Sequence, residues 1–192
     1  GFYIDGKVRD LDNTTPDIID LYEMILEAKQ KGCKTVVMEV SSQALMFGRI
    51  GKLMFDYAIF TNLTLEHLDY HKTMEEYALA KQKLFKRVKG YAVINIDSDY
   101  YKYFMLDNNN ITYGMKEASY MISDICDTFK VNNITYKTNL IGKYNIYNLV
   151  ISIIILDEEN IKYDKSIFNE LRLPKGRMEI IRYNENMIVV DY

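Results

Sequence analysis

The sequence predicts an α/β fold in which a mainly parallel sheet is flanked by helices and carries a small antiparallel subsheet. Up to Ile96, short β-rich runs alternate with segments of helical periodicity. After Ser119 the pattern changes to short strand-like runs that follow one another without a helix. The 192 residues, 48% of them hydrophobic, are enough to bury one sizeable core.

One helix is expected near the N-terminus. Thr15 can cap this helix, Pro16 can occupy its first turn, and Gly32 can end it. Residues 1–10, before the helix, read as a strand with no preceding element to pair with. The apolar face of the helix is expected to consist of Ile18, Leu21, Tyr22, Ile25 and Ala28.

The remaining elements follow in a regular order. Helices or loops separate the strands that are expected up to Ile96, which favours parallel pairing between these strands. An antiparallel hairpin set is expected between Ser119 and Leu140, broken at Asn132 and Asn133. The other expected strands are Thr35–Val40, Tyr57–Phe60 and Tyr91–Ile96. The other expected elements are helices at Thr73–Val88, Asn145–Leu156 and Lys165–Leu171, and a hairpin around Asn184–Asn186.

Charge and hydropathy exclude several classes of protein. The net charge of −3 gives no broad electrostatic attraction to nucleic acid. The longest apolar run, Leu149–Leu156, is far shorter than the roughly 20 residues that cross a bilayer, and residues 1–10 do not resemble a signal peptide. A soluble, cytoplasmic protein without a membrane partner is therefore expected. Cys33 and Cys126 form no CxxC motif and are expected to be reduced cysteines of the core.

The helix expected after Thr73 carries a lysine in an unusual position. At about 100° per residue, Lys81 falls inside the apolar arc of this helix, whereas Lys83, Lys86 and Lys89 fall outside it. Desolvation disfavours a buried ammonium, so Lys81 needs a carboxylate partner, a route to water or chemical conversion. The arc consists of Tyr77, Ala80, Leu84, Phe85 and Val88.

Metal-ligating residue types cluster just before this helix. Glu66, His67, Asp69 and His71 lie within six positions, and Glu39 ends an expected strand, where ligands gather in open α/β sheets. The cluster fits a metal site, but a polar loop whose histidines cap or pack explains it as well. A Mg²⁺- or Zn²⁺-dependent hydrolase built on His67, Asp69 and His71 is a further alternative, although the zinc motif HExxH is absent.

Five motifs appear in an order that is found in the Mur ligases, and together they span nearly the whole chain. They are MEVSSQAL, FTNLTLEHLDYH, YALAKQKLF, GKYNIYN and GRME. The chain therefore resembles the Mur ligases, and the wording HLDYH resembles the MurE branch in particular. The resemblance implies a Rossmann-like central domain that handles ATP and Mg²⁺.

The resemblance implies a particular metal site. In this family the lysine that matches Lys81 is carbamylated by CO₂, which turns a cation into an anion able to hold Mg²⁺. Glu39 and His67 match residues of the same magnesium region. Oxygen ligands from a carboxylate and a carbamate suit Mg²⁺ well. Lys81, Glu39 and His67 are therefore the expected catalytic and metal-binding residues.

The resemblance also implies an ATP-dependent acid–amino-acid ligase of peptidoglycan synthesis. The γ-phosphoryl group of ATP would pass to the terminal carboxylate of UDP-N-acetylmuramoyl-L-Ala-D-Glu. The amine of lysine or diaminopimelate would then attack the acyl phosphate. Mg²⁺ would neutralise charge on the phosphoryl oxygens, so that catalysis would rest on positioning and electrostatics.

The family pattern also assigns substrate contacts. The residues assigned to the muramoyl-dipeptide are Thr14, Thr15, Ser41 and Arg49, and those assigned to the nucleotide are Asn148, Arg177 and Asp191. Hydroxyls and a guanidinium suit diphosphate and carboxylate groups. Three positions depart from the pattern: Gln43 and Glu66 replace the usual His and Asp, and Phe47 stands where relatives often use a polar substrate contact.

The ATP-phosphate loop GxxxxGK(S/T) does not occur in the 192 residues. Residues 1–173 are thus expected to be an N-terminally truncated central domain, and residues 174–192 the start of the C-terminal domain. Such a piece is expected to be inactive by itself and to self-associate through an exposed sheet edge. The alternatives are a non-catalytic muramoyl-peptide-binding module and a ligase like folylpolyglutamate synthase.

Overall fold

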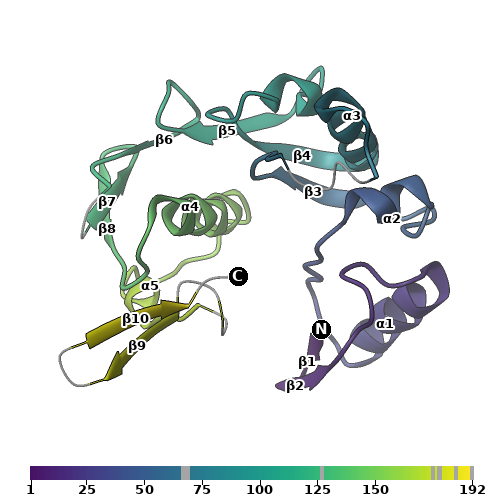
Figure 1. The fold of residues 1–192 in the computed structure, drawn as a ribbon, viewed down its shortest axis with the longest axis horizontal. Helices are drawn as coiled ribbons and strands as arrows, with labels where there is room; N and C mark the ends of the chain where they lie inside the picture. Colours follow the sequence, from purple (N-terminus) through teal and green to yellow (C-terminus); the bar gives the residue numbers. More distant parts are fainter. Residues whose placement is uncertain (66–69, 126–127, 174–175, 177–178, 184–185, 191–192) are drawn as a thin grey trace. The chain divides into compact units, whose positions relative to one another are not determined.

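The computed structural model describes residues 1–65, 70–125, 128–173, 176, 179–183 and 186–190 (Figure 1). The helices are α1 (Ile18–Gln30), α2 (Ser42–Met46), α3 (Met74–Phe85), the 3₁₀ helix η1 (Tyr101–Phe104), α4 (Lys143–Glu158) and α5 (Ile167–Glu170). The strands are β1 (Phe2–Ile4), β2 (Lys7–Arg9), β3 (Phe55–Phe60), β4 (Val88–Asn95), β5 (Asn110–Gly114), β6 (Tyr120–Ser123), β7 (Thr128–Val131), β8 (Ile134–Lys137), β9 (Glu179–Tyr183) and β10 (Asn186–Val190). Within the described ranges, no helix is long and apolar enough to cross a lipid bilayer.

Six strands form one sheet in the order β3-β4-β5-β6-β7-β8, and the hairpins β1-β2 and β9-β10 form two-stranded sheets. Backbone hydrogen bonds lead from residues 92 and 96 to residues 109 and 113, so residue numbers rise together as in parallel strands. β5 pairs with β6 in parallel, whereas β6, β7 and β8 pair antiparallel. The predicted α/β class, with a mainly parallel sheet and an antiparallel subsheet, is confirmed.

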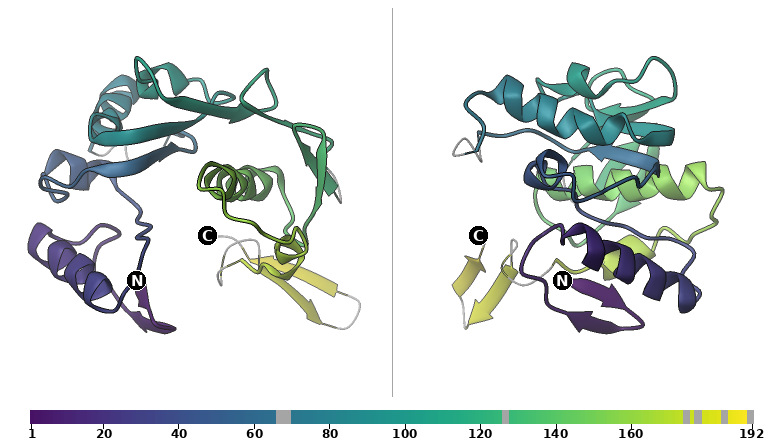
Figure 2. Two further views of the ribbon diagram at one scale, coloured as in Figure 1. Left: turned by 180° about the vertical axis from the view of Figure 1, so that it is seen from behind. Right: turned by 90° about the vertical axis from the view of Figure 1, so that its right-hand side faces the viewer.

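The chain divides into two compact units, one of residues 1–92 and 100–110, and one of residues 93–99 and 111–192. In the first unit, Leu21 of α1 forms an apolar cluster with Leu45 and Ile50. A second packing centre lies at Phe104 of η1, whose ring stacks on Phe60 with centroids 3.9 Å apart. In the views of Figure 2, α3 lies along one face of β3 and β4. These contacts fix α2 and α3, which carry the candidate site.

In the second unit, α4 lies against strands β5 to β8 (Figure 1). The rings of Tyr113 on β5 and Tyr147 on α4 lie with centroids 6.2 Å apart, and Tyr113 is fully buried. Asn132 and Asn133 join β7 to β8 with φ values of 47° and 66°. Both values lie in the left-handed region that two-residue hairpin turns require, and asparagine tolerates that region. The predicted break at these residues is confirmed.

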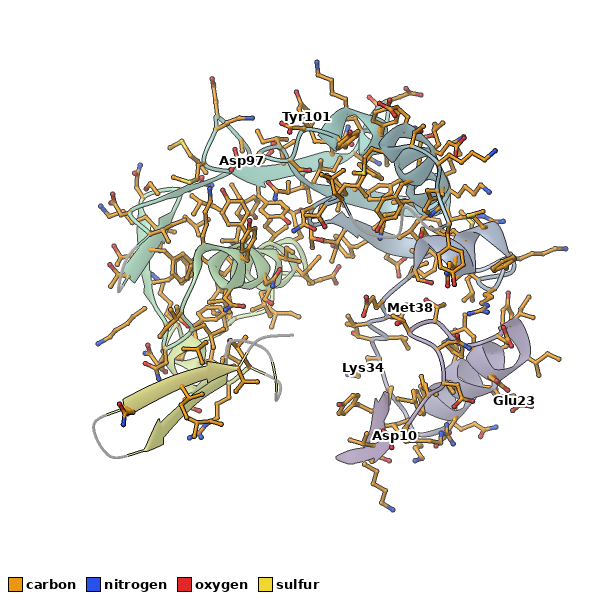
Figure 3. The ribbon with its side chains drawn as sticks, in the orientation of Figure 1. Asp10, Glu23, Lys34, Met38, Asp97 and Tyr101 are labelled. Carbon is orange, nitrogen blue, oxygen red and sulfur yellow. The ribbon has the colours of Figure 1, made fainter. Side chains whose placement is uncertain are left out.

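Asp97, labelled in Figure 3, fixes the chain just beyond the end of β4. Its carboxylate accepts hydrogen bonds from the Tyr147 hydroxyl, from Met115 N–H at 2.6 Å and from Lys116 N–H at 3.4 Å. Burial raises the pKa of Asp97, but these donors outweigh burial and hold the pKa below its ordinary value. A Cβ atom at Gly114 would lie 2.8 Å from the carboxylate, so glycine is required there. Asp97 is therefore satisfied entirely by its own unit.

Two strand predictions are wrong. Residues 1–10 do not lack a partner, because they pair with each other as β1-β2 around Asp5 and Gly6, which both have positive φ. Thr35–Val40 forms no strand, since a strand needs a neighbour for its backbone hydrogen bonds and no described strand pairs with this segment. Figure 3 shows the segment from Lys34 to Met38 running outside the sheet. Its Val37 side chain is 90% exposed.

Other predictions need correction in detail. The N-cap residue of α1 is Asp17 and not Thr15, because Thr15 lies outside the helix and its hydroxyl bonds elsewhere. Helix α3 ends at Phe85, so Val88 belongs to β4 and not to the helical arc. Cys33 is free but exposed, and therefore is not a core residue. Cys126 lies outside the described residues.

Candidate functional site

Two hydroxyl side chains hold the loop before α1 against the start of α2. The Thr15 hydroxyl donates to Glu39 O at 2.9 Å and accepts from Ser41 N–H at 3.0 Å. Ser41 is the N-cap of α2, and its hydroxyl accepts from Ala44 N–H at 3.1 Å. Thr15 is buried and Thr14 is exposed. The structure thus brings together Thr15 and Ser41, two of the residues that the sequence assigns to the muramoyl-dipeptide.

Arg49 lies beside the same loop. Its Nε forms an ion pair with Asp17 Oδ1 at 3.0 Å, and its NH1 donates to Thr15 O at 3.2 Å. The guanidinium carbon lies 5.9 Å from the centroid of the Phe47 ring. The pairing of Asp17 with Arg49 was not predicted from the sequence. The place of Asp17 directly after Thr14, Thr15 and Pro16 was the only available signal.

An open depression of about 430 Å³ lies at this arginine. It is lined by Asp17, Ile18, Phe47, Gly48 and Arg49. A guanidinium fork suits a carboxylate or a phosphate, so the depression can take an anionic group. Asp17 offsets part of the positive charge, and an anionic ligand would therefore share Arg49 with Asp17 or displace it. The Phe47 side chain, 69% exposed, adds an apolar wall in place of a polar contact.

The second part of the site is α3. Thr73 caps this helix by accepting from Glu76 N–H at 3.1 Å, and Glu76 Oε2 accepts from Lys72 N–H at 2.9 Å. Lys81 lies half-buried on the helix, whereas Lys83 is exposed. The Lys81 Nζ atom lies over the Tyr77 ring, 5.4 Å from its centroid. The helix thus places one amine in a half-buried position over an aromatic ring, while it leaves a second amine in solvent.

Burial lowers the pKa of Lys81, and the negative charge of Glu39 offsets part of this effect. Within the part of the chain that the structure describes, no carboxylate lies within 4 Å of the Lys81 amine. The Glu39 side chain is exposed, and its backbone oxygen is held by Thr15. The structure therefore relates Glu39 and Lys81 through charge and does not join them in a direct ion pair.

The donor set fits a magnesium ion only in part. In the described ranges, no three His, Cys, Asp or Glu side chains gather closely enough to hold a metal ion. His67, with Glu66 and Asp69, lies outside the described residues. Glu39 offers the oxygen ligands that Mg²⁺ prefers, but an ammonium repels the ion. Lys81 suits such a site only after it gains an anionic group, and its lowered pKa favours this because a neutral amine is the nucleophilic form.

His71 has a different role from the one that a hydrolase would need. It is 2% exposed, its Nε2 lies 2.9 Å from Ser42 Oγ, and its ring stacks on Tyr77 with centroids 4.8 Å apart. Its contacts are therefore inside the protein, between α2 and α3. Of the two interpretations of this residue from the sequence, a metal ligand or a histidine that caps or packs, the structure supports packing for His71. The buried pairing with Ser42 could not be seen from sequence spacing, because the two residues are 29 positions apart.

The residues assigned to the nucleotide belong to the second unit. Asn148 lies on α4 with an exposed side chain, between the buried Tyr147 and Leu149 in the sequence. The neighbouring Asn145 donates to Ile141 O at 2.6 Å and is thereby bound to the chain before the helix. Arg177 and Asp191 lie outside the described residues. Of the three assigned residues, the structure therefore describes Asn148 alone.

Comparison with known proteins identifies the family. Residues 1–156 match the Mur ligase middle domain, which is well over half of the chain. The chain belongs to this family. Because the match includes α2, α3 and α4 up to residue 156, it contains every candidate site residue except Arg177 and Asp191.

Curated relatives of this Mur ligase middle domain include UDP-N-acetylmuramoyl-L-alanyl-D-glutamate–2,6-diaminopimelate ligases. The protein from Fusobacterium nucleatum is 37% identical over 206 residues, which cover 100% of this chain and 42% of the relative. The protein from Listeria monocytogenes is 35% identical over 212 residues, with 98% and 43% coverage. The chain therefore spans less than half the length of the curated relatives that it matches.

Solved structures agree with this assignment. A structure of a UDP-N-acetylmuramoyl-L-alanyl-D-glutamate–2,6-diaminopimelate ligase matches with a TM-score of 0.78 and 28% identity, over 92% of this chain and 40% of that chain. A pseudomurein peptide ligase type C from Methanothermus fervidus matches with a TM-score of 0.65 and 19% identity, over 80% and 41%. An L. casei FPGS variant matches at a TM-score of 0.53 and 12% identity, over 90% and 53%. The last two similarities show the fold alone, so the folylpolyglutamate synthase alternative is not favoured.

Proposed function

We propose that this chain is part of an ATP-dependent ligase of peptidoglycan synthesis. The ligase adds lysine or diaminopimelate to UDP-N-acetylmuramoyl-L-Ala-D-Glu in the cytoplasm. The curated relatives are named UDP-N-acetylmuramoyl-L-alanyl-D-glutamate–2,6-diaminopimelate ligases, and they match nearly the whole chain at up to 37% identity. The observation that carries the proposal is Lys81, a half-buried amine with a lowered pKa, under the influence of Glu39, in a chain of the Mur ligase family.

Lys81 supplies the magnesium side of the proposed site. Its neutral amine attacks the carbon of CO₂ and releases a proton, which gives a carbamate whose single negative charge is shared by two oxygens. Together with the carboxylate of Glu39 and with His67, this group would hold Mg²⁺. Bound Mg²⁺ would neutralise charge on the phosphoryl oxygens during transfer. Conversion to a carbamate would also account for the half-buried position of Lys81, because bound Mg²⁺ would compensate the charge of the resulting anion.

The loops around α2 supply the muramoyl-dipeptide side. Arg49 lies in an open depression, and its guanidinium can bind a carboxylate or a diphosphate. Thr15 and Ser41 fix the backbone beside it, and the exposed Thr14 offers a further hydroxyl. These residues bind and orient the acceptor, so that its carboxylate can take the γ-phosphoryl group of ATP. No protein nucleophile is needed, since the incoming amine attacks the acyl phosphate directly.

The nucleotide contacts are proposed for the second unit. The exposed Asn148 would bind on the adenine side, and Arg177 and Asp191 on the ribose or phosphate side. We also place the boundary to the C-terminal Mur ligase domain at residues 173 and 174. The separate β9-β10 sheet supports this boundary, because neither strand belongs to the six-stranded sheet. The 192 residues hold no GxxxxGK(S/T) motif, so they hold only part of the proposed ATP site.

Phosphate release by the complete gene product tests this function. The reaction contains ATP, Mg²⁺, UDP-N-acetylmuramoyl-L-Ala-D-Glu and either lysine or diaminopimelate. Release is expected only when all four components are present, and omission of any one should abolish it. The 192-residue chain alone should release no phosphate.

Three results would contradict the proposal. They are phosphate release without an amino acid, hydrolysis of the muramoyl-dipeptide without ATP, and release that requires a folate with glutamate in place of the muramoyl-dipeptide.

A matched control replaces Asp17 by Asn. This variant keeps Arg49 but removes its ion pair, and it should bind the anionic acceptor at least as tightly as the parent protein because competition for the guanidinium is lost.

A further inference from the structure

Ser42 and His71 form a polar pair inside the first unit. His71 Nε2 lies 2.9 Å from Ser42 Oγ, and the two residues are 2% and 4% exposed. Removing two polar side chains from water is unfavourable unless they bind each other, and leaving one of them unpaired would destabilise the fold. Ser42 is the first residue of α2, and His71 lies three residues before α3. The pair therefore fixes the start of one helix relative to the start of the other.

The imidazole ring of His71 also fixes an aromatic side chain. Its ring and that of Tyr77 are nearly parallel, with an interplanar angle of 18° and centroids 4.8 Å apart. Tyr77 is 6% exposed and lies one helical turn before Lys81. The Lys81 Nζ atom lies over this tyrosine ring. Ser42, His71, Tyr77 and Lys81 thus form a continuous series of contacts.

This series connects the two parts of the candidate site. At one end, Ser42 follows Ser41, whose backbone is held by Thr15. At the other end is the half-buried amine of Lys81. We propose that His71 is a positioning residue, which holds the Tyr77 ring and, through it, the Lys81 amine in register with the loop that carries Ser41. This inference deepens the proposed function, because it concerns the same lysine.

The position of Lys81 can be measured without any reaction. Protons that lie over an aromatic ring are shifted by its ring current, so the Lys81 ε-methylene should have a displaced NMR signal in the 192-residue chain with ¹³C-labelled lysine. A Lys81→Met variant assigns the signal by removing it. Lys83, exposed on the same helix, provides the undisplaced reference. The measurement needs neither ATP, Mg²⁺ nor CO₂.

Four substitutions test the series of contacts. Tyr77→Phe keeps the ring and should keep the displaced signal, whereas Tyr77→Leu should bring the signal to the Lys83 reference. Ser42→Ala and His71→Phe each remove the polar pair, and His71→Phe keeps a ring against Tyr77. Two populations of Lys81 are compared: one with the side chain over the Tyr77 ring and one with it elsewhere. Each substitution should lower the ratio of the first to the second about fivefold, the change expected for one net hydrogen bond. The Ser42→Ala/His71→Phe double variant should change the ratio no further, because both act through one contact.

Two results would overturn the proposal. The first is a full ring-current displacement in folded Ser42→Ala and His71→Phe variants. The second is a double variant whose effect is the sum of the single effects, which would indicate general loosening. If His71→Phe does not fold, Ser42→Ala decides alone, since it removes a single oxygen atom. An unchanged Lys81 signal in these variants would overturn the positioning role of His71 but not the proposed ligase function. Failure of the complete gene product to release phosphate would overturn the ligase function but not the ring-current result.

Discussion

The Asp97 carboxylate accepts hydrogen bonds from three groups of its own unit. Among the described residues, by contrast, no group forms a hydrogen bond with the Lys81 amine. Asp97 is compensated so well that its pKa is lowered despite burial. Lys81 is compensated by the charge of Glu39 and by the Tyr77 ring, and burial still lowers its pKa. The charged form is thus favoured at Asp97 and disfavoured at Lys81.

The difference separates a structural charge from a functional one. A charge that its own chain satisfies stabilises the fold and has little capacity left for a ligand. A charge that burial disfavours destabilises the fold slightly and is available for chemistry. Replacement of Asp97 should therefore reduce stability without a direct effect on the site. Replacement of Lys81 should impair the site and change stability little.

The largest effect is expected for Lys81→Met in the complete gene product. Methionine fills similar space but cannot form a carbamate, so ligase activity should fall about a hundredfold or more, as when one group that stabilises developing charge is lost. Because a desolvated cation is removed, the free energy of unfolding should change by less than about 1 kcal/mol. Phosphate release and urea unfolding give the two values. Lys83→Met, at an exposed position of the same helix, should keep full activity.

A smaller effect is expected for Asp97→Asn. The neutral amide weakens the hydrogen bonds from Tyr147, Met115 and Lys116, and the free energy of unfolding should fall by about 1.5 kcal/mol. Urea unfolding of the 192-residue chain measures this change. The matched control is Asp99→Asn, which alters an exposed carboxylate two residues away and should change stability little. Equal effects of the two substitutions would contradict the structural role of Asp97.

The lowered pKa of Asp97 makes its contribution depend on pH. The carboxylate is ionised in the unfolded chain above about pH 4, and its folded pKa is lower than its unfolded pKa. Its stabilising effect is therefore complete above the unfolded pKa and is lost as the pH falls through the folded pKa. The stability difference between the parent chain and Asp97→Asn should be constant from pH 7 to about pH 5 and should narrow below about pH 4. A difference that widens on acidification would be incompatible with this sign.

The smallest effect is expected for self-association through the backbone at the edge of the six-stranded sheet. β3 is an edge strand of the six-stranded sheet, whereas β5 has a neighbour on each side. An exposed edge favours pairing with another chain, and the charge of Asp56 on β3 opposes it. We expect weak, concentration-dependent self-association of the 192-residue chain in sedimentation velocity, and stronger association for Asp56→Val than for the control Asp107→Val. A monomer at every concentration in all three proteins would rule out self-association through the β3 edge.

Much of the fold could be predicted because local patterns determine it. The alternation at Tyr57–Phe60 and Tyr91–Ile96, the periodicity of α3 and the turn at Asn132 and Asn133 are all local signals. The strand expected at Thr35–Val40 failed because β-rich sequence gives a strand only where a neighbour completes its hydrogen bonds. Thr15 failed as a cap because Glu39 and Ser41, distant in sequence, occupy its hydroxyl.

The candidate site was predictable in part. The helical arc indicated that Lys81 is unusual, and the structure confirms a half-buried amine with a lowered pKa. The pairing of His71 with Ser42 and of Arg49 with Asp17 was not predictable, because both depend on tertiary contacts over 29 and 32 residues. The roles of Lys81, Glu39 and His67, and those of the substrate-side and nucleotide-side residues, all stay predictions.

The most direct test of the central claim is whether Lys81 takes up CO₂. The 192-residue chain is equilibrated with ¹³C-labelled bicarbonate and Mg²⁺, and carbamate carbons are observed by NMR. The α-amino group of Gly1 gives its own signal in every variant, so the comparison between variants isolates Lys81. We predict an additional carbamate signal in the parent chain that persists in Lys83→Met and disappears in Lys81→Met. A parent chain without this signal, or a signal that survives Lys81→Met, would contradict the account.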